Sequence, residues 1–411
     1  MPAARPARLL DRSSPPHIAT MIALTSLAAL SMNLFLPSLP GMTAHFGTTY
    51  GVMQIAVAGY LGVNAVMQLG IGPISDRFGR RSVMLWAIGI FCLATIGCLL
   101  ATHVAVFLFF RMMQAAIVAG LVLPRAAIRD LYSQDESASM IGYVTMGMSV
   151  APMLAPALGG VLDGLFGWQA SFVALLLAGL ATGALAFWDM GETATRTTSN
   201  FRQQVAQYPD LLSAPRFWGY AGTAALSSGA FFAYLGGAPY VGSTVFDLSP
   251  ATLGTYFGAP AIGYLVGNGL TGRYARRVGT NRMVLIGCFV NAGGLVVSLA
   301  ASYAGLGGPP AFFGFMTFVG LGNGLVIPNA TAGSLSVRPH LAGTASGLGG
   351  AIMIGGGAAL SALAGVLLTG AESSRPLLWL MLATAIGSVA AILFVIRREA
   401  RLSGSQARMS G

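Results

Sequence analysis

Charged residues are scarce in this sequence. Asp, Glu, Lys and Arg together make up 8% of the 411 residues, and every one of the 22 basic residues is an arginine. Soluble domains carry roughly a quarter charged residues, so a soluble globular protein is excluded. Disorder is excluded as well, because disordered chains have low hydrophobicity, whereas hydrophobic residues make up 55% of this chain.

Residues that carry enzyme chemistry are also scarce. The three cysteines, Cys92, Cys98 and Cys288, lie inside apolar runs, which is typical of small buried residues and not of a disulfide framework or a metal site. The sequence has no P-loop, no H-E-x-x-H pair and no nucleophile elbow. The glycine clusters at 347–350 and 355–357 lie inside an apolar run, where glycine serves helix packing. We therefore expect neither an enzyme nor a bound metal or cofactor.

Long apolar runs are what the sequence does contain. A helix needs about 20 apolar residues to cross the hydrocarbon core of a bilayer, so the runs predict an all-α integral membrane protein with twelve transmembrane helices. The first run is too long for a signal peptide and is expected to be an uncleaved span. We place the spans at 17–39, 50–73, 83–101, 104–124, 137–163, 168–188, 216–243, 250–272, 281–302, 310–336, 340–369 and 375–396.

The arginines are distributed unevenly between the two sides of these spans. If the N-terminus is cytoplasmic, all of them except Arg111 and Arg375 fall on the cytoplasmic side. This distribution follows the positive-inside rule and predicts that both termini are cytoplasmic. It also explains the net charge of +10 without nucleic acid, and contact with anionic lipid headgroups is the expected consequence.

The spans form two sets of six, separated by the only long polar stretch. Two echoes indicate a duplication: the segment 77–81 recurs in altered form at 273–277, and the Gly-Val-Leu of 160–162 recurs at 365–367. Two pseudo-symmetric six-helix halves are the architecture of major facilitator transporters. The expected parts are a cytoplasmic N-terminal tail (1–16), an N-terminal six-helix bundle (17–190), a cytoplasmic central loop (191–215), a C-terminal six-helix bundle (216–397) and a cytoplasmic tail (398–411).

The segment GIGPISDRFGRR at 70–81 carries the most specific motif. Its glycines allow close helix approach, and a carboxylate just beyond the second span can pair with arginine or with a helix N-terminus. On charge alone, a plain positive-inside loop explains the segment equally well. The full pattern resembles motif A of the major facilitator superfamily, which implies a conformational latch. Its residues here are Gly72, Asp76, Arg77, Gly79, Arg80 and Arg81.

Arg111 lies well inside the fourth span, where an arginine costs roughly 2.5–3.5 kcal/mol on insertion scales. Its side chain either extends to the membrane surface or faces the interior of the bundle and needs an acceptor there. The R-x-x-Q pattern of Arg111 and Gln114 resembles motif B of the superfamily. That resemblance implies a role in charge coupling or in binding an anionic group.

The fifth span contains the sequence GMSVAPMLAPALGG at 147–160. Prolines kink a helix and glycines give it a flat packing face, so a bend around neighbouring helices is one explanation. The pattern resembles motif C of the antiporter branches, which implies export and a seal between the fifth and eleventh spans. Its residues here are Gly147, Pro152, Pro156, Gly159 and Gly160.

Short segments elsewhere narrow the resemblance to one branch. Together with motifs A and C, they are similar to the bicyclomycin/chloramphenicol-resistance (Bcr/CflA) branch of bacterial drug:proton antiporters. The resemblance covers residues 17–398 and implies alternating access, in which two halves rock about a midplane cavity. The segments are LPSLP at 36–40, RDLY at 129–132, APYV at 238–241, PNA at 328–330 and AGTAS at 342–346.

One position departs from that branch and bears on proton coupling. Members of the branch carry an Asp in the first span, and this chain has Asn33 there, which cannot titrate. A proton carrier in a membrane is usually Asp, Glu or His, and none of these lies in the middle of a span. Asp163 and Asp247, near outer span ends, are possible replacements, although both also fit loops. A proton-independent facilitator or exchanger of small metabolites therefore stays open.

Polar side chains inside the spans indicate where a substrate would bind. Tyr60, Asn64 and Gln68 share one helical face, and such a face contacts protein or water and not lipid. With Arg111 as its only charge, the cavity would suit neutral or anionic amphipathic molecules. Hydrogen bonding between helices without ligand contact is the alternative for each residue. The predicted lining is Asn33, Tyr60, Asn64, Gln68, Phe232, Tyr234 and Asn329.

These observations predict a secondary active transporter of the multidrug efflux type. It would export small amphipathic molecules resembling chloramphenicol or bicyclomycin across the bacterial inner membrane by alternating access, in exchange for protons. The proton gradient is the expected energy source, and no cofactor is expected. The expected partners are a small-molecule substrate and membrane lipids, with no nucleic acid and a monomeric state. A transport-dead sensor is disfavoured, because it would carry a further soluble signalling domain.

Overall fold

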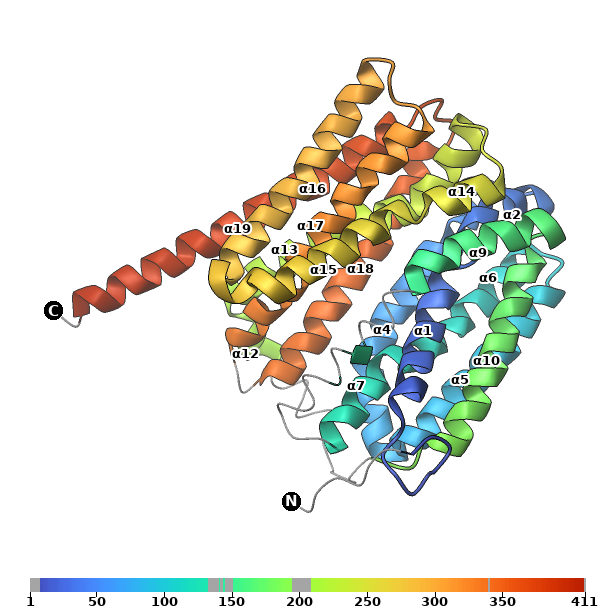
Figure 1. Ribbon diagram of the computed structural model, residues 1–411, viewed down its shortest axis with the longest axis horizontal. Helices are drawn as coiled ribbons and strands as arrows, with labels where there is room; N and C mark the ends of the chain where they lie inside the picture. The colour runs from blue at the N-terminus through green and yellow to red at the C-terminus, as the bar shows by residue number, and fades with distance from the viewer. Residues whose placement is uncertain are drawn as a thin grey trace. The chain divides into compact units, whose positions relative to one another are not determined.

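The computed structural model describes residues 8–131, 140, 143–144, 151–193, 208–338 and 341–409. Within this part of the chain the regular structure is entirely helical, which confirms the predicted all-α class. The chain divides into two compact units. Unit 1 consists of Met1–Phe201 and Leu248–Gly258, and unit 2 of Arg202–Asp247 and Ala259–Gly411. Each unit is a bundle of helices (Figure 1).

Unit 1 contains most of the N-terminal half of the chain. At the start of α1, His17 Nδ1 accepts a hydrogen bond from the backbone N–H of Ala19 and so caps the helix. The elements are α1 (Ile18–Asn33), η1 (Leu36–Ser38), α2 (Leu39–His45), α3 (Tyr50–Met53), α4 (Ile55–Phe78), α5 (Arg80–Leu100), α6 (Val104–Met113), η2 (Gln114–Val118), α7 (Ala119–Leu131), α9 (Ala151–Phe166), α10 (Gln169–Asp189) and α14 (Pro250–Tyr256).

Unit 2 contains the remaining helices. Glycine at positive φ separates consecutive helices in both units: Gly79 between α4 and α5 has φ +91°, and Gly279 between α15 and α16 has φ +88°, a conformation that glycine adopts at little cost. The elements of unit 2 are α12 (Tyr208–Leu212), α13 (Pro215–Tyr240), the π-helical turn η3 (Val241–Val245), α15 (Ala259–Val278), α16 (Thr280–Tyr303), α17 (Pro309–Ser336), α18 (Ala342–Leu368) and α19 (Arg375–Met409).

Nine helical segments of the described chain are long and apolar enough to cross a membrane. The other three predicted spans fall on α9, on α13 and on α14 with α15. Among these, α9 is described only from Ala151, and α15 ends in a run that contains several arginines. The nine segments are Ile18–His45, Tyr50–Phe78, Arg80–Leu100, Val104–Ile128, Gln169–Asp189, Thr280–Tyr303, Pro309–Ser336, Thr344–Leu368 and Arg375–Arg401.

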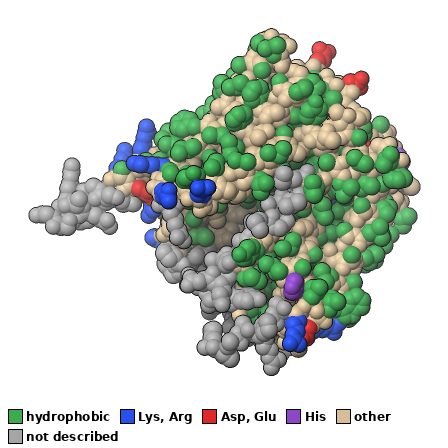
Figure 2. All heavy atoms as spheres, viewed as in Figure 1, with side chains coloured by type: hydrophobic (Ala, Val, Ile, Leu, Met, Phe, Trp, Pro, Cys, Tyr) green, Lys and Arg blue, Asp and Glu red, His purple; other side chains and the backbone are tan. Residues whose placement is uncertain are grey.

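Large apolar side chains point outward from the helices. Trp86, Leu100 and Phe166 are each more than two-thirds exposed, and hydrophobic side chains cover much of the visible face in Figure 2. Soluble monomers rarely expose apolar patches of this extent. The surface therefore fits a protein whose helices face lipid.

One sequence-based expectation needs correction. The residues after the second span do not form a loop: α4 continues to Phe78 and α5 begins at Arg80, so Asp76 lies in the last turn of a helix. The echo at 273–277 also lies inside α15, about one turn before Gly279. Gly279 occupies the place of Gly79 in the fold, so the sequence echo is displaced along the helix from its structural counterpart.

Glycine brings the helices of unit 2 into backbone contact. A β-carbon at Gly320 on α17 would overlap the carbonyl oxygen of Pro260 on α15, and one at Gly263 on α15 would overlap the carbonyl oxygen of Thr317. Small residues allow this close approach between membrane helices. The crossing of α15 and α17 is therefore fixed by the absence of side chains.

Candidate functional site

Arg80 lies at the centre of the predicted latch. Although charged, it is only 8% exposed. Its Nη2 lies 3.0 Å from Asp76 Oδ1 on α4, and its Nε donates to Asp130 Oδ2 on α7 at 2.5 Å. Its Nη1 donates to Ser75 Oγ at 3.0 Å. Two carboxylates on one guanidinium are a strong charge-assisted arrangement, and this one ties α4, α5 and α7 together.

Glu192, just after α10, completes this end of unit 1. Its Oε1 accepts a hydrogen bond from the Arg80 backbone N–H at 2.8 Å, which places a carboxylate at the N-terminus of α5, where the helix dipole favours it. A β-carbon at Gly79 would clash with Glu192 Oε2. Gly79 is thus required both by its positive φ and by the approach of Glu192.

The remaining latch residues do not join this cluster. Arg81 Nη2 donates to the Phe187 carbonyl at 3.1 Å, and the Arg77 guanidinium lies 5.4 Å from the centroid of the Phe78 ring. At Gly72 an added β-carbon would meet nothing within 4 Å. The structure therefore brings together Asp76, Gly79 and Arg80, whereas sequence reasoning missed Asp130 and Glu192, which lie far from the motif in sequence.

Arg111 is fully buried at the end of α6. Its Nη1 donates to Gln114 Oε1 at 2.6 Å, its Nη2 to the Ser31 carbonyl at 2.9 Å and its Nε to the Ala56 carbonyl at 3.2 Å. These contacts join α1, α4 and the fourth span inside unit 1. They exclude the alternative in which the side chain extends to the membrane surface.

Aromatic rings cover the guanidinium of Arg111. Its Cζ lies 4.0 Å from the centroid of the Tyr60 ring and 4.3 Å from that of Phe35, which gives two cation–π contacts. Among the described residues, no carboxylate forms an ion pair with Arg111. Within the described part of the chain, the positive charge is held by neutral acceptors and π-faces.

Gln114 extends the Arg111 contacts to a further helix. Its Nε2 donates to Thr95 Oγ1 on α5 at 2.8 Å, and Thr95 Oγ1 donates to the Phe91 carbonyl at 2.6 Å. Both Gln114 and Thr95 are fully buried. The R-x-x-Q pattern thus forms the centre of a continuous hydrogen-bonded chain that crosses unit 1.

The predicted cavity residues of unit 1 divide into separate contacts. Tyr60 packs on Arg111, and its hydroxyl donates to Ser31 Oγ at 3.3 Å. Gln68 Nε2 donates to Asn64 Oδ1 at 3.1 Å, as expected for residues one turn apart on one helix. Asn33 Nδ2 donates to the Ala29 carbonyl of its own helix at 2.7 Å.

The predicted cavity residues of unit 2 are all buried. Phe232 leaves no room for a β-carbon at Gly357 on α18. The Tyr234 ring packs against Phe313, with ring centroids 6.3 Å apart. Asn329 Nδ2 donates to the Leu325 carbonyl at 2.8 Å. Phe232 and Tyr234 both contact Phe231 of their own helix, with ring centroids 6.2 and 6.3 Å from its ring, whereas Asn329 Nδ2 also donates to Thr271 Oγ1 on α15 at 3.3 Å.

The predicted motif C lies on α9. A β-carbon at Gly159 would overlap the Leu34 carbonyl oxygen, and one at Gly160 would overlap the Pro250 carbonyl oxygen at the start of α14. Pro156 lies inside the helix. The glycine pair therefore allows α9 to pack directly against two other backbone segments, one at Leu34 and one at Pro250. Gly147 and the side chain of Pro152 lie outside the described residues.

A second buried polar cluster lies in unit 2, on helices that correspond to those around Arg111. Ser227 Oγ on α13 donates to Asn323 Oδ1 on α17 at 2.7 Å, and Asn291 Nδ2 on α16 lies 3.4 Å from Ser227 Oγ. Asn291 Oδ1 is buried without a hydrogen-bond partner in the described chain. Asparagine inside an apolar run is a sequence signal that could have identified this cluster. Only asparagines at other positions were predicted to line a cavity.

Known proteins resemble this chain over most of its length. The model of the Major Facilitator Superfamily matches residues 21–362. Multidrug resistance protein D of Escherichia coli (strain K12) is 30% identical over 394 residues, covering 89% of this chain and 95% of that protein. The Chloramphenicol resistance protein of Pseudomonas aeruginosa is 30% identical over 335 residues, covering 80% of this chain and 79% of that protein.

A third relative and a solved structure extend the likeness. The Bicyclomycin resistance protein homolog of Haemophilus influenzae is 26% identical over 393 residues, covering 94% of this chain and 98% of that protein. The crystal structure of a bacterial homologue of the human lysosomal transporter Spinster, inward-facing and occupied, superposes with a TM-score of 0.71 at 16% identity. It covers 93% of this chain and 96% of that chain, so the helical fold is shared across both units.

Proposed function

Because the chain belongs to the Major Facilitator Superfamily and is therefore a multi-pass membrane transporter and not an enzyme, we propose that it exports small amphipathic drugs. Relatives named for chloramphenicol, bicyclomycin and multidrug resistance support this substrate class. We place the protein in the bacterial inner membrane with both termini in the cytoplasm, as the arginine distribution indicates. Its units would alternate access to a central substrate site.

The observation that carries this proposal furthest is the environment of Arg111. Arg111 is fully buried and is held only by neutral acceptors among the described residues. The site therefore has no negative charge that would attract a lipophilic cation. Neutral amphipathic molecules, or molecules with one anionic group, therefore fit the site better. In this proposal Arg111 and Gln114 hold the first, second and fourth spans in one arrangement and respond to charge that reaches Tyr60.

The Arg80 cluster is proposed as the latch of one conformation. Its guanidinium holds carboxylates from α4 and α7 together, so any motion that separates these helix ends must break charge-assisted bonds. Gly159 and Gly160 act through shape instead, because their backbone contacts with Leu34 and Pro250 leave no room for a side chain. The seal between the fifth and eleventh spans stays a prediction.

Proton exchange is proposed to use Asp163. This residue lies inside α9 and half-buried, beside the Ser38 hydroxyl of η1, whereas Asp247 lies outside the helices and exposed. Burying an ionisable residue within a membrane helix costs free energy, so such a residue is a candidate for a functional role. Asn33 cannot take this role, since an amide does not titrate.

The test separates transport from coupling. The purified protein in weakly buffered detergent solution is mixed with chloramphenicol while the pH is followed, and drug uptake is measured in proteoliposomes with and without a pH gradient. We expect drug-linked proton release by the parent protein and by Asp247→Asn, and its loss in Asp163→Asn. Absence of chloramphenicol binding and transport in the parent protein would contradict the proposed substrate class.

One observation favours a second candidate function. No described acid contacts Arg111, and the position of the branch's usual carboxylate is Asn33. A proton-independent facilitator or exchanger of small metabolites would need no titrating group. Uptake that proceeds equally with and without a pH gradient, with no proton release on binding, would favour this alternative.

A further inference from the structure

The last residue of α10, Asp189, is a fully buried carboxylate that takes no part in the sites described above. Its Oδ2 accepts a hydrogen bond from Thr20 Oγ1 in the first turn of α1 at 2.6 Å. The carboxylate also accepts from two backbone N–H groups that precede α1, those of Leu10 at 2.7 Å and of His17 at 2.8 Å. Asp189 therefore joins the sixth span to the first span and to the segment before it.

The segment before α1 lies closely against the end of α10. Leu10 has φ +63°, a left-handed conformation that is costly for a leucine. The Arg12 guanidinium lies 4.3 Å from the centroid of the Phe187 ring on α10. A β-carbon at Gly191 would overlap the Arg12 carbonyl oxygen. The strained backbone at Leu10 is thus held in place by its contacts with the end of the sixth span.

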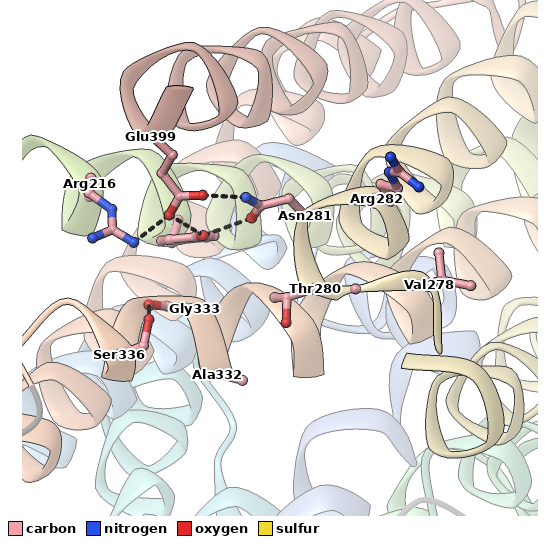
Figure 3. Close-up of a pocket in the computed structure, with 11 residues that line it drawn as sticks. Arg216, Val278, Thr280, Asn281, Arg282, Ala332, Gly333, Ser336 and Glu399 are labelled. Atoms are coloured by element: carbon pink, nitrogen blue, oxygen red, sulfur yellow. Dashed lines mark hydrogen bonds and ion pairs between the residues drawn. The ribbon is translucent and has the colours of Figure 1, made fainter. Parts of the chain in front are cut away.

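Unit 2 repeats this connection with different side chains. Glu399 on α19, the helix of the twelfth span, forms an ion pair with Arg216 at the start of α13, the helix of the seventh span. Asn281 Nδ2 donates to Glu399 Oε2 at 2.5 Å, and the Tyr220 hydroxyl lies 3.1 Å from Glu399 Oε1. Figure 3 shows Glu399 between Arg216 and Asn281. A carboxylate of the last span again holds the first span of its set.

A further pair of residues supports the correspondence between the units. Arg81 and Asn281 are each the second residue after the positive-φ glycine that separates two helices. Arg81 Nη2 donates to the Phe187 carbonyl of α10, and Asn281 donates to Glu399 of α19. The third span of each set is thus tied to the sixth. We define the unit 1 clasp as Asp189 with Leu10, His17 and Thr20, and the unit 2 clasp as Glu399 with Arg216, Tyr220 and Asn281.

The two clasps differ in how easily they can be opened. Asp189 is fully buried, so its donors would be left buried and unsatisfied without it, which is costly. The side chains of Glu399 and Arg216 are 27% and 31% exposed. With Asn281 they border a cavity of about 410 Å³ whose lining contains two arginines (Figure 3). Polar groups released there can be hydrated, so the unit 2 clasp costs less to break.

We propose that Asp189 and Glu399 are positioning residues for transport. Each clasp keeps the first span of a set beside the sixth, so that the helices of a unit move together; this role rests on the alternating access proposed above. The first span also carries Ser31, whose carbonyl accepts a hydrogen bond from Arg111. The unit 1 clasp therefore fixes the helix that provides one side of the Arg111 contacts.

The experiment measures hydrogen–deuterium exchange of the purified full-length protein in detergent, without substrate. Asp189→Asn replaces one acceptor oxygen by a donor, so peptides covering residues 8–20 should exchange about tenfold faster, because buried donors lose their partner. Glu399→Gln keeps an acceptor and affects groups that can be hydrated, so peptides covering 215–222 should exchange about threefold faster. Exchange at the parent rate in either variant would overturn the corresponding clasp.

Milder variants keep the test decisive if Asp189→Asn does not fold. Thr20→Val removes only the hydroxyl donor and should speed exchange in the same peptides to a smaller extent. In unit 2, Arg216→Gln/Glu399→Gln should exchange no faster than either single variant, because coupled partners are not additive. Additive effects would overturn the unit 2 clasp. The matched control is Arg398→Gln, an exposed neighbour of Glu399 on α19, which should exchange like the parent.

Transport separates a positioning role from a local structural contact. Drug efflux per folded protein should fall several-fold in Asp189→Asn and less in Glu399→Gln, in the same order as the exchange rates. Efflux equal to that of the parent in both variants, despite faster exchange, would overturn the positioning role. A parent protein that does not transport chloramphenicol would contradict the proposed function alone, because the exchange measurements use no substrate.

Discussion

Two corresponding helix crossings, one in each unit, are built in opposite ways. Where the fourth span meets the second in unit 1, Arg111 reaches across and donates to the Ala56 carbonyl. Where the tenth span meets the eighth in unit 2, Gly320 brings its backbone directly against the Pro260 carbonyl. One crossing is held by a long charged side chain, and the other by the absence of one.

This difference shows how a duplicated architecture can separate its tasks. The polar cluster of unit 1 contains a buried charge, whereas the cluster of Ser227, Asn291 and Asn323 in unit 2 is neutral. A buried charge responds to the charge of a substrate or a proton, because electrostatic interactions are strong in a low dielectric. The proposed charge sensing is therefore placed at Arg111 in unit 1.

The largest expected effect is on the charged crossing. Arg111→Lys keeps the charge, but a lysine presents one nitrogen where the arginine uses three, so buried carbonyl groups lose their donors. We expect transport to fall at least tenfold, measured as drug efflux from cells matched for expression. Arg375→Lys, which changes an arginine outside the cluster, should stay within twofold. Full activity of Arg111→Lys would show that only the charge is needed.

The next effect tests the glycine crossing. Gly320→Ala must separate α17 from α15, because the new β-carbon would overlap the Pro260 carbonyl, and overpacking costs about 1–3 kcal/mol. We expect a lower melting temperature in detergent. Gly314→Ala on the same helix meets nothing within 4 Å and should melt with the parent. Gly59→Ala in unit 1 meets the side chains of Ile55 and Met112 and no backbone atom of another helix, so its effect should be intermediate. A loss equal to that of Gly320→Ala would contradict the comparison.

A smaller effect is expected at the Arg80 cluster. Asp76→Asn and Asp130→Asn each leave Arg80 with one carboxylate, so each should reduce transport several-fold while expression is unchanged. The double variant should lose more than either, because the second carboxylate then no longer compensates for the first. Radiolabelled drug efflux measures all three. If Asp76→Asn transports like the parent, the proposed latch role of that residue is wrong.

The smallest effect is expected in the neutral cluster. Asn291→Leu removes a buried carbonyl oxygen that has no partner in the described chain, together with two weak contacts at 3.4 Å. Loss of an unsatisfied group is close to neutral, so the melting temperature and transport should stay near those of the parent. A strong loss of transport with normal stability would mean that Asn291 contacts substrate, and unit 2 would then share the recognition role.

The sequence predicted the helices more reliably than their contacts. Apolar runs located the starts of the described long helices to within about three residues, because a membrane span must be apolar over its whole length. Several helices continue past the predicted ends, among them α4 to Phe78 and α19 to Met409. The loop expected before Arg80 is wrong, since arginine and aspartate are compatible with the last helical turn. The family resemblance predicted from the motifs is confirmed by the superfamily match and the resistance-protein relatives.

The contact partners of the site residues were harder to predict from the sequence. Asp130 and Glu192 contact Arg80 from positions that are distant in sequence, and no local spacing links them. Arg111 was expected to need an acceptor, but a carboxylate, a carbonyl or an aromatic ring would each satisfy that need. The choice among them depends on which helix faces are turned toward the arginine.

By itself, the sequence determined the class of protein, the positions of its membrane helices and the motifs that identify its family, because these follow from hydrophobicity and from residue types at fixed spacing. Only the tertiary structure decided that Arg111 is held by neutral groups, that Glu192 fills the start of α5, and that the start of α16 borders a basic cavity. These properties arise where helices distant in sequence meet, and the partners there are chosen by packing.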